Sequence, residues 1–425
     1  MRNASQTGGP EWASFDHLAV AAMEDPAPLL GQLRAACPVG RSEQHGGFWV
    51  LSRYEDAGAA ARQPELFKSA PRPGPGPGFP FSDTYPVDIP MIGSDPPLHR
   101  DFREPLHKAF SAASARRMEP VLRQIVTDLM DDFIETGEAD LARELSIPFP
   151  AMVTSELLGL PQAGRGIFHG WAHEIVATGG DTPAFASLIS YIDALYDLRQ
   201  AEPGEDIPSQ MLGWQIAGRA IQKQEWTGTV LLLILAGLDT TANGGALMLH
   251  FLGTRPDIRA GLACDPSAIP AAVEELLRWT TPVPQHSRGV AEDVTVGGTC
   301  LRKGDVVLLH WMSANRDPDE FPQPETFVPD RFPNRHYAFG TGPHRCLGAH
   351  LARVELRVLL EEVLGRLPDY ELVAGGMTRY PSLNRGVSAL RVTFPPGPRG
   401  PARRGTTEFS ADEPSAAESA AGVIS

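Results

Sequence analysis

The distribution of apolar residues predicts a long buried helix near the middle of the chain. Apolar side chains occur on all sides of a helical repeat over residues 226–252, a length of about 40 Å at 1.5 Å per residue. A helix that is apolar on all sides belongs in a protein core. Its most apolar run, residues 230–236, is too short to span a bilayer and is soon followed by Asp239, so we expect no membrane anchor.

The remaining periodicity predicts a mainly α protein with small sheets. Strand content is confined to short segments, residues 47–51, 293–296 and 306–310. Helical spacing recurs in a larger set: residues 53–63, 116–136, 149–158, 164–179, 183–201 and 347–366. Proline and glycine exclude regular structure over residues 71–80, which is either a linker between domains or a long loop of one domain. The composition after residue 395 predicts a disordered tail.

Composition and charge narrow the class of protein. With 425 residues and 42% hydrophobic content, the chain can bury a large core, in one large domain or two or three ordinary ones. The formal net charge of −15 argues against nucleic acid or an anionic membrane as a partner. The four cysteines (Cys37, Cys264, Cys300, Cys346) form no dense disulfide framework, and the N-terminus lacks a signal peptide, so we expect a cytoplasmic protein.

The segment around Cys346 is the strongest candidate for chemistry. It reads Phe-Gly-Thr-Gly-Pro-His-Arg-Cys-Leu-Gly over residues 339–348 and leads into a helical segment. Its glycines allow the backbone to approach a flat ligand closely, and the start of a helix favours a thiolate over a thiol. Cys346 is therefore a candidate metal ligand, whereas an isolated intracellular cysteine is usually a small core residue.

Three further pairs allow a functional and a structural interpretation. Asp239 and Thr240 place an acid and a hydroxyl inside the apolar helix, although Thr240 could simply bond back to the carbonyl of Ala236. His99 and Arg103 share one helix face, as do Glu275 and Arg278, and each pair could be a solvated or exposed pair.

The Cys346 segment resembles the haem-binding signature of the cytochrome P450 family, Phe-Gly-x-Gly-x-His-x-Cys-x-Gly, at every fixed position. The resemblance covers residues 20–395 and implies one domain with the triangular, mainly α-helical haem-thiolate fold and small β-sheets, between disordered segments 1–19 and 396–425. It implies that Cys346 is the axial thiolate of a haem b. The haem contacts that it implies are Phe339, Gly340, Ala236 and, for the propionates, His99, Arg103, Arg288 and His344.

The same resemblance assigns roles to the other pairs. Gly237, Asp239 and Thr240 match the oxygen-activation motif, in which the acid relays protons. Glu275 and Arg278 match a buried structural pair that is joined by Arg331 and locks the cysteine loop. The proline-rich segment becomes a loop that faces the substrate, and residues 164–179 and 183–201 cap the pocket. Residues 380–394 resemble the family's terminal hairpin, whose turn enters the pocket near Leu383 and Asn384. The residues expected to line the pocket are Phe79, Ile89, Leu232, Leu235, Pro284, Gln285 and Leu383.

The function implied is a soluble monooxygenase that uses O₂ and electrons from NAD(P)H, delivered by a ferredoxin reductase and a ferredoxin, to oxidise a small to medium organic molecule in catabolism or secondary metabolism. We expect a monomer without nucleic-acid or membrane partners. Basic residues near the loop would dock an acidic ferredoxin: Arg103, Lys108, Arg116, Arg117, His344, Arg345 and Arg353. Two alternatives stay open: oxidative coupling, desaturation or bond cleavage without net oxygen insertion, and a haem sensor without enzymatic activity.

Overall fold

The computed structural model describes residues 12–69, 89–160, 171, 182–380 and 382–400. The expected loop over residues 71–80, most of the expected helix over residues 164–179, and Phe79 lie outside these ranges.

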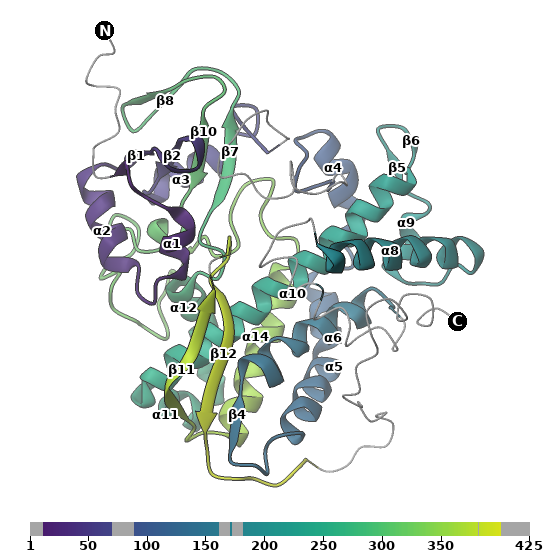
Figure 1. The fold of residues 1–425 in the computed structure, drawn as a ribbon, viewed down its shortest axis with the longest axis vertical. Helices are drawn as coiled ribbons and strands as arrows, with labels where there is room; N and C mark the ends of the chain where they lie inside the picture. The colour runs from purple at the N-terminus through teal and green to yellow at the C-terminus, as the bar shows by residue number, and fades with distance from the viewer. Residues whose placement is uncertain (1–11, 70–88, 161–170, 172–181, 381, 401–425) are drawn as a thin grey trace.

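The long helix predicted from the apolar pattern runs through the centre of the fold as α10 (Lys223–Thr254) (Figure 1). It begins with a capping box, in which the Gln222 side chain accepts from the N–H of Glu225 while the Glu225 carboxylate accepts from the N–H of Gln222. By length and composition alone α10 could cross a membrane, but 83% of its most apolar window is buried inside the protein, as in a core helix. Its two halves belong to two different hydrophobic clusters.

The second half of α10 lies in the larger cluster. Residues from Ala242 to Leu252 pack there with neighbouring helices and with the C-terminal strands. The helices of this region are α5 (Ala112–Asp131), the π-helix η5 (Ala142–Ser146), α6 (Pro148–Leu157), α11 (Pro256–Cys264), the 3₁₀ turn η7 (Pro266–Ala268), α12 (Ile269–Thr280) and α14 (Ala349–Arg366). The first half of α10 packs in the other cluster, with α4 (Leu98–Arg103), α8 (Pro183–Ala201) and α9 (Ile207–Met211).

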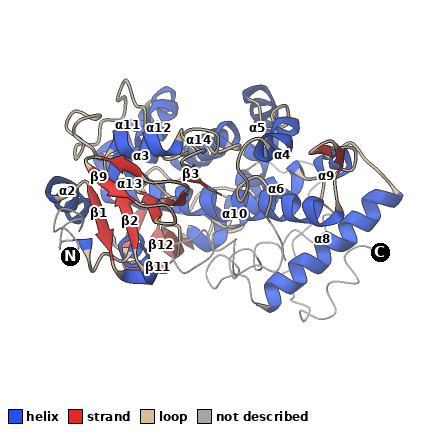
Figure 2. Ribbon diagram, turned by 90° about the horizontal axis from the view of Figure 1, so that it is seen from above, coloured by secondary structure: helices blue, strands red, loops and turns tan. Residues whose placement is uncertain are grey.

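The larger sheet holds strands from both ends of the sequence, and it lies at the N-terminal side of the molecule, away from α8 (Figure 2). Its order is β1 (Val39–Ser42), β2 (Phe48–Leu51), β10 (Val306–Leu309), β7 (His286–Val290), β3 (Phe67–Lys68), and only β2 and β10 are parallel. The flanking elements are α1 (His17–Ala22), α2 (Ala27–Ala36), the 3₁₀ turn η3 (Gln44–Gly46), α3 (Tyr54–Ala61) and α13 (Trp311–Ala314).

A second sheet carries the C-terminal hairpin, β11 (Glu371–Tyr380) and β12 (Gly386–Thr393), with β4 (Glu138–Asp140) at its edge. Two small pairs complete the strands: β5 (Gln215–Ile216) with β6 (Arg219–Ala220), and β8 (Val294–Val296) with β9 (Thr299–Leu301). The 3₁₀ turn η4 (Glu104–Leu106) extends α4. The hairpin lies against α10 and delivers its turn toward the centre of the molecule (Figure 1).

The expected domain limits need correction at both ends. Trp12 is 0% and Phe15 is 4% exposed, and α1 begins at His17, so the packed structure begins before residue 20. At the other end, the N–H of Gly400 donates to Asp131 of α5 at 2.9 Å, so residues 396–400 also lie against the fold. These limits were hard to predict because the first segment, residues 12–19, is short and the second, residues 396–400, is rich in glycine and proline.

Candidate functional site

The loop that carries Cys346 is folded back on itself. The N–H of Cys346 donates to the carbonyl of Phe339 at 2.8 Å, and the N–H of Gly340 donates to the carbonyl of Tyr337 at 2.9 Å. Gly342 has φ +75°, and a Cβ there would lie 2.2 Å from the carbonyl oxygen of Ala61 in α3. A glycine is therefore required where the loop passes α3. A Cβ on Gly340 would meet no described atom within 4 Å, so this side of the loop is open.

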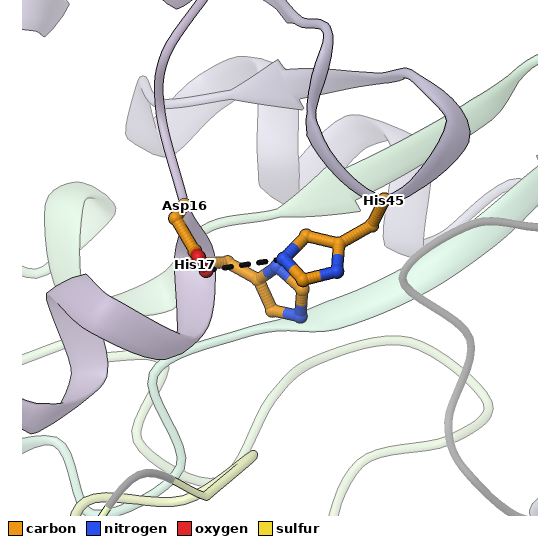
Figure 3. Close-up of side chains that lie close together, drawn as sticks. All are labelled: Asp16, His17 and His45. Carbon is orange, nitrogen blue, oxygen red and sulfur yellow. Dashed lines mark hydrogen bonds and ion pairs between the residues drawn. The ribbon is translucent and has the colours of Figure 1, made fainter.

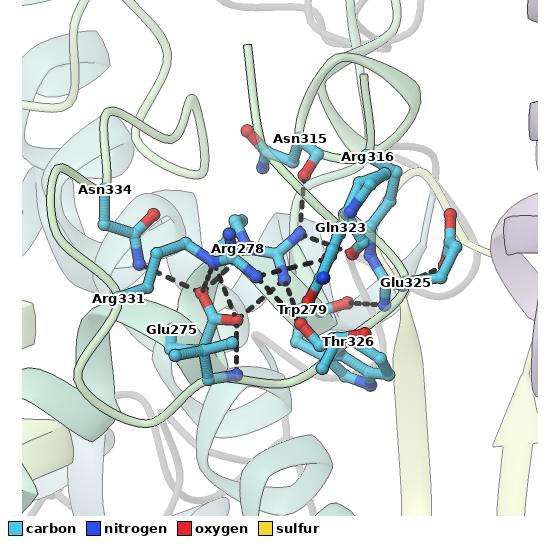
Figure 4. A network of polar contacts seen from close by, with 12 residues as sticks. Glu275, Arg278, Trp279, Asn315, Arg316, Gln323, Glu325, Thr326, Arg331 and Asn334 are labelled. Carbon is cyan, nitrogen blue, oxygen red and sulfur yellow. Dashed lines mark hydrogen bonds and ion pairs between the residues drawn. The ribbon is translucent and has the colours of Figure 1, made fainter. Parts of the chain in front are cut away.

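A buried ion-pair network on α12 holds the segment between β10 and the Cys346 loop (Figure 4). Glu275 and Arg278 are both 0% exposed and are joined by two hydrogen bonds of 2.7 Å. Arg331 donates its Nε to both oxygens of Glu275 at 3.1 Å. Burial alone would raise the pKa of Glu275, but the hydrogen bonds from Arg278 hold that pKa below its ordinary value. The structure thus brings the three expected residues together.

The neighbouring Glu274 braces the loop itself, a contact that the sequence analysis missed. Its carboxylate pairs with Arg353 of α14 at 2.6 and 2.8 Å and with His336 at 3.2 Å. The guanidinium of Arg353 lies over the ring of Phe339, 4.4 Å from its centroid. Burial alone would raise the pKa of Glu274, but these partners lower it to about 2. Two adjacent acids of α12 therefore fix both ends of the segment that presents Cys346.

Cys346 is exposed, three residues before the start of α14. Surrounding protein raises the pKa of its thiol, while the Gly348 N–H and the charge of Arg103 lower it less strongly. The Gly348 N–H at the start of α14 thus acts in the expected direction, but the surrounding protein outweighs it. At this raised pKa the thiol would lose its proton when a metal ion binds the sulfur, because metal binding displaces the proton.

Cationic side chains from three elements gather beside the loop. His99 and Arg103 lie one turn apart on α4, and the ring of His99 lies 4.3 Å from that of His344, centroid to centroid. Arg103 donates to the carbonyl of Arg345 at 2.5 Å. The Nε2 atoms of His99 and His344 are buried and have no hydrogen-bond partner among the described residues. Such orphaned buried donors are costly unless a ligand binds them.

β7 contributes the third part of the cluster. Alternation along the strand places His286 and Arg288 on one face, and Arg288 is 8% exposed. Burial, followed by the charge of Arg288, lowers the pKa of His344 to about 2. Burial and the charge of Arg103 lower that of His99 to about 4. His286, in contrast, already accepts from the Trp311 indole at 2.7 Å. The electrostatic field here disfavours protonated histidine and would favour an anion.

The middle of α10 has a stripe that the core leaves open. Most residues from Trp226 to Leu252 are buried, but Ala236 is exposed and Leu233, Gly237 and Thr240 are half-buried. These positions follow the i, i+3, i+4, i+7 spacing of one helix face. Two expected pocket residues, Leu232 and Leu235, flank this stripe; they are 4% and 3% exposed and pack in the cluster of α4, α8 and α9, so their place in the pocket stays a prediction.

The acid and the hydroxyl of α10 have different partners. Thr240 Oγ1 donates to the Ala236 carbonyl at 2.8 Å, which is the contact of the structural interpretation. Asp239 is 8% exposed, and both of its oxygens accept hydrogen bonds from the C-terminal hairpin. The Tyr380 hydroxyl donates to Oδ1 at 3.1 Å and the Asn384 amide donates to Oδ2 at 2.7 Å. Neither hairpin residue was predicted to hold the acid.

The other expected pocket residues are dispersed. Ile89 is 5% exposed within the cluster of α8 and α10, and Leu383 is half-buried in the hairpin turn. Pro284 is buried, and its carbonyl accepts from the N–H of Met312 at 3.1 Å. Gln285 donates to the carbonyl of His17 at 3.4 Å. Its amide nitrogen is thus directed toward α1, while its Oε1 is buried without a hydrogen-bond partner among the described residues.

A second buried acid, Glu355 of α14, also escaped the sequence analysis. It is 4% exposed and hydrogen bonds with Thr241, next to the acid–hydroxyl pair. Burial raises its pKa to about 8, so the carboxyl is protonated at neutral pH. Its signal in the sequence was weak, because a glutamate on an amphipathic helix is usually exposed.

One more group of possible metal ligands lies at the N-terminal side: Asp16, His17 and His45 (Figure 3). Their nearest ligand atoms are within 4.8 Å of one another. Asp16 Oδ1 caps α1 by accepting from the N–H groups of Leu18 and Ala19 at 2.9 and 3.3 Å, and it pairs with His45 at 3.1 Å. Because the helix dipole disfavours a cation there, capping and ion pairing account for this group.

The arrangement around Cys346 fits a flat, dianionic ligand with a central metal. The open side of Gly340 and the stripe of α10 leave room for a planar group, and the thiol can ligate a metal. The orphaned Nε2 donors of His99 and His344, with the guanidinium of Arg103, suit two carboxylates. These are the properties of haem.

Comparisons with known proteins agree with this geometry. The sequence profile of the family described as Cytochrome P450 matches residues 268–368. The mycinamicin IV hydroxylase/epoxidase of Micromonospora griseorubida is 35% identical over 80% of this chain and 88% of that protein. The steroid C26-monooxygenase of Mycobacterium tuberculosis is 33% identical over 86% of this chain and 99% of that protein. CYP108D1 from Novosphingobium aromaticivorans superposes with a TM-score of 0.81 at 27% identity, over 92% of this chain and 100% of that chain. The expected mainly helical fold is thereby confirmed.

Proposed function

The chain belongs to the cytochrome P450 family, and from this premise we propose that Cys346 ligates the iron of a haem b. The observation that carries the proposal is an exposed thiol on a doubly braced loop, next to buried imidazole nitrogens that lack partners. The propionates would be held by His99, Arg103, Arg288 and His344. Bound carboxylates would remove the cost of the orphaned donors and raise the depressed pKa values of His99 and His344.

The chain is a monooxygenase that uses O₂ and external electron donors, as the family does. When bound, haem supplies the activation of dioxygen and the transfer of one oxygen atom. The protein's own part is to deliver protons and exclude water on the α10 side. We propose that Asp239 passes protons toward Thr240, whose hydroxyl lies on the open stripe of α10. Gly237 lies beside Thr240 on this stripe, and a Cβ there would lie 2.8 Å from Thr154 Oγ1, so the glycine lets α10 pass close to α6.

We propose that electrons reach the loop face from NAD(P)H through a reductase and a ferredoxin. Arg345, Lys108, Arg116 and Arg117 are exposed and supply positive charge for an acidic partner. Three residues of the expected patch would be engaged elsewhere. His344 and Arg103 would hold the propionates, and Arg353 is paired with Glu274. The docking charge is therefore concentrated on Arg345 and the start of α5.

We propose a small to medium organic substrate, oxidised in catabolism or secondary metabolism. The relatives whose names mention mycinamicin IV and a steroid support a substrate of that size. The four cysteines are all free, which supports a reducing cytoplasm. We also keep the expectation of a monomer.

The test is the ratio of product formed to NAD(P)H oxidised, measured with ¹⁸O₂ and a turned-over surrogate substrate. Thr240→Ala should keep its haem, consume NAD(P)H nearly as fast and yield far less labelled product, because the loss of a positioned proton donor costs on the order of 10² to 10⁴ in its step. Thr229→Ala is the matched control, because Thr229 makes the same kind of bond to a carbonyl of α10, that of Glu225 at 2.7 Å, but is buried near the start of the helix. An unchanged ratio in Thr240→Ala would make its bond to Ala236 purely structural, and product without label would favour coupling or desaturation.

A further inference from the structure

The C-terminal hairpin is hydrogen-bonded to α10 at Asp239. Tyr380 ends β11, Asn384 lies in the turn, and each donates to a different oxygen of the carboxylate, at 3.1 and 2.7 Å. One helical turn further along α10, the Asn243 side chain accepts from the N–H of Val387 in β12 at 2.9 Å. In each of these three contacts the two residues are more than 140 positions apart in the sequence, so the contacts are formed by the tertiary fold.

The position of the Tyr380 ring is determined by the backbone around it. Tyr380 pairs with Gly386 across the hairpin, and a Cβ on Gly386 would lie 2.5 Å from the ring. The turn itself is anchored by Arg385, which donates to the carbonyl of Thr280 at 3.0 Å and to those of Met23 and Glu24 at 3.0 and 2.9 Å. The ring therefore lies over a glycine within an anchored turn.

The two donors differ in what they can do chemically. A hydroxyl donates one hydrogen and accepts others, so it can receive a proton while it gives one away, whereas an amide NH₂ can only hold an acceptor in place. Burial, with Asp239 as the next cause, raises the pKa of Tyr380, which keeps the phenol protonated and donating. Tyr380 is half-buried while Asp239 is buried, so the phenol lies on the outer side of the acid.

We propose that Tyr380 is the proton-donating partner of Asp239 and that Asn384 is a clamp, so that the C-terminal hairpin positions the acid used in oxygen activation. A proton passes from Tyr380 Oη to Asp239 Oδ1 while a hydronium ion from bulk solvent gives one to Oη and is left as water, so the phenol is neutral before and after and the carboxyl gains one proton. Both are positioning residues, since they act through Asp239. This inference rests on the proposed function of Asp239, and the family motif names the acid without naming its partners.

The activity test compares five haem-loaded variants, Asp239→Asn and the four below, for the rate of turnover and the ratio of product to NAD(P)H oxidised, in H₂O and in D₂O. Tyr380→Phe should lower the ratio by about 10- to 100-fold, the range for one hydrogen bond to a charged group, and enlarge the solvent isotope effect on it. Gly386→Ala should act in the same direction, because it displaces the ring without removing the hydroxyl. Asn384→Ala should lower the ratio without changing the isotope effect. The control is Tyr370→Phe, which removes another phenol bond to α10, at 2.5 Å to the carbonyl of Leu249.

A second readout does not depend on activity. In thermal unfolding, Tyr380→Phe and Asp239→Asn should each lower Tm by about 1 to 3 °C, and the double variant should lower it by less than the sum, because both remove the same contact. Additive losses would mean that the two side chains are not bonded in solution, and the proposal would be overturned.

The outcomes distinguish the role of Tyr380 from the proposed function of Asp239. If Tyr380→Phe leaves both the ratio and the isotope effect unchanged while Asp239→Asn slows turnover, the role of Tyr380 is wrong and the proposed function stands. If Asp239→Asn is also without effect, the proton-relay part of the proposed function fails. An equal loss in Tyr370→Phe would reduce the effect to general destabilisation and would also overturn the role of Tyr380.

Discussion

Two sets of buried charged or polar side chains flank the Cys346 loop, and they differ in whether their partners are inside the protein. In the first, Glu275 faces Arg278 and Arg331, and its two oxygens are fully used (Figure 4). In the second, Arg103 donates to a backbone carbonyl, and the Nε2 atoms of His99 and His344 are buried without partners among the described residues. A satisfied network stabilises the loop, whereas an unsatisfied one is prepared for a ligand.

The comparison predicts its largest effect in the first set. Glu275→Ala leaves Arg278 buried without its counter-charge, so it should cost at least about 3–5 kcal/mol and lower the yield of folded protein. Urea unfolding of the haem-loaded protein measures this. Glu320→Ala is the control, because the Arg335 side chain that it pairs with is 68% exposed and such a pair contributes about 0–1 kcal/mol. Equal losses in the two variants would abolish the distinction between a buried network and a surface pair.

Glu355 tests an intermediate case, in which a proton takes the place of a counter-charge. Its folded pKa of about 8 lies above the ordinary value of 4.5, so folding takes up a proton and stability should fall as the pH rises from 4.5 to 8. Glu355→Gln should remove this loss and stabilise the protein at pH 8 by on the order of 4 kcal/mol, with little change near pH 4.5. The free energies of unfolding of the wild type and of Glu355→Gln, measured at pH 4.5 and at pH 8, test this prediction. A constant difference between variant and wild type would show that Glu355 does not titrate in this range.

Both networks show what sequence alone could and could not predict. The apolar runs located α10, α14 and α8 to within a few residues, because burial and helical period leave a direct trace in the sequence. The Glu275–Arg278 pair was found through its spacing and motif. Partners such as Asn384 and Glu274 were missed, since nothing local distinguishes them from surface residues. The place of Leu232 and Leu235 in the pocket stays a prediction, because an all-apolar helix does not reveal which face a core leaves open.

In the second set, replacement of an unsatisfied histidine should affect the ligand more than the fold. His99→Phe should leave the stability of the haem-free protein unchanged or higher, because an orphaned nitrogen is removed, but should speed haem loss about 10- to 100-fold. Transfer of haem to excess apomyoglobin gives the rate. His336→Phe is the matched control, since His336 already pairs with Glu274 and its loss should destabilise the haem-free protein. The comparison fails if the two variants behave alike.

The smallest expected effect is that of Arg345, an exposed charge on the Cys346 loop. Arg345→Glu should slow electron transfer from ferredoxin several-fold at low salt, and the difference should shrink as salt screens the charges. Stopped-flow reduction over a range of ionic strengths measures it. Arg143→Glu is a suitable control, because Arg143 lies beside the C-terminal sheet and its side chain is 70% exposed. Reduction that does not depend on salt would argue for an apolar docking surface.

The central claim is that the unsatisfied set and Cys346 together form a haem-thiolate site. The most direct measurement is the absorption spectrum of the reduced, CO-bound protein, with one haem b per chain determined in the same sample. The account predicts a red-shifted Soret band in the wild type and in Cys37→Ala, Cys264→Ala and Cys300→Ala, and its loss in Cys346→Ala. A band that survives in Cys346→Ala, or that disappears in one of the other three variants, would contradict the account.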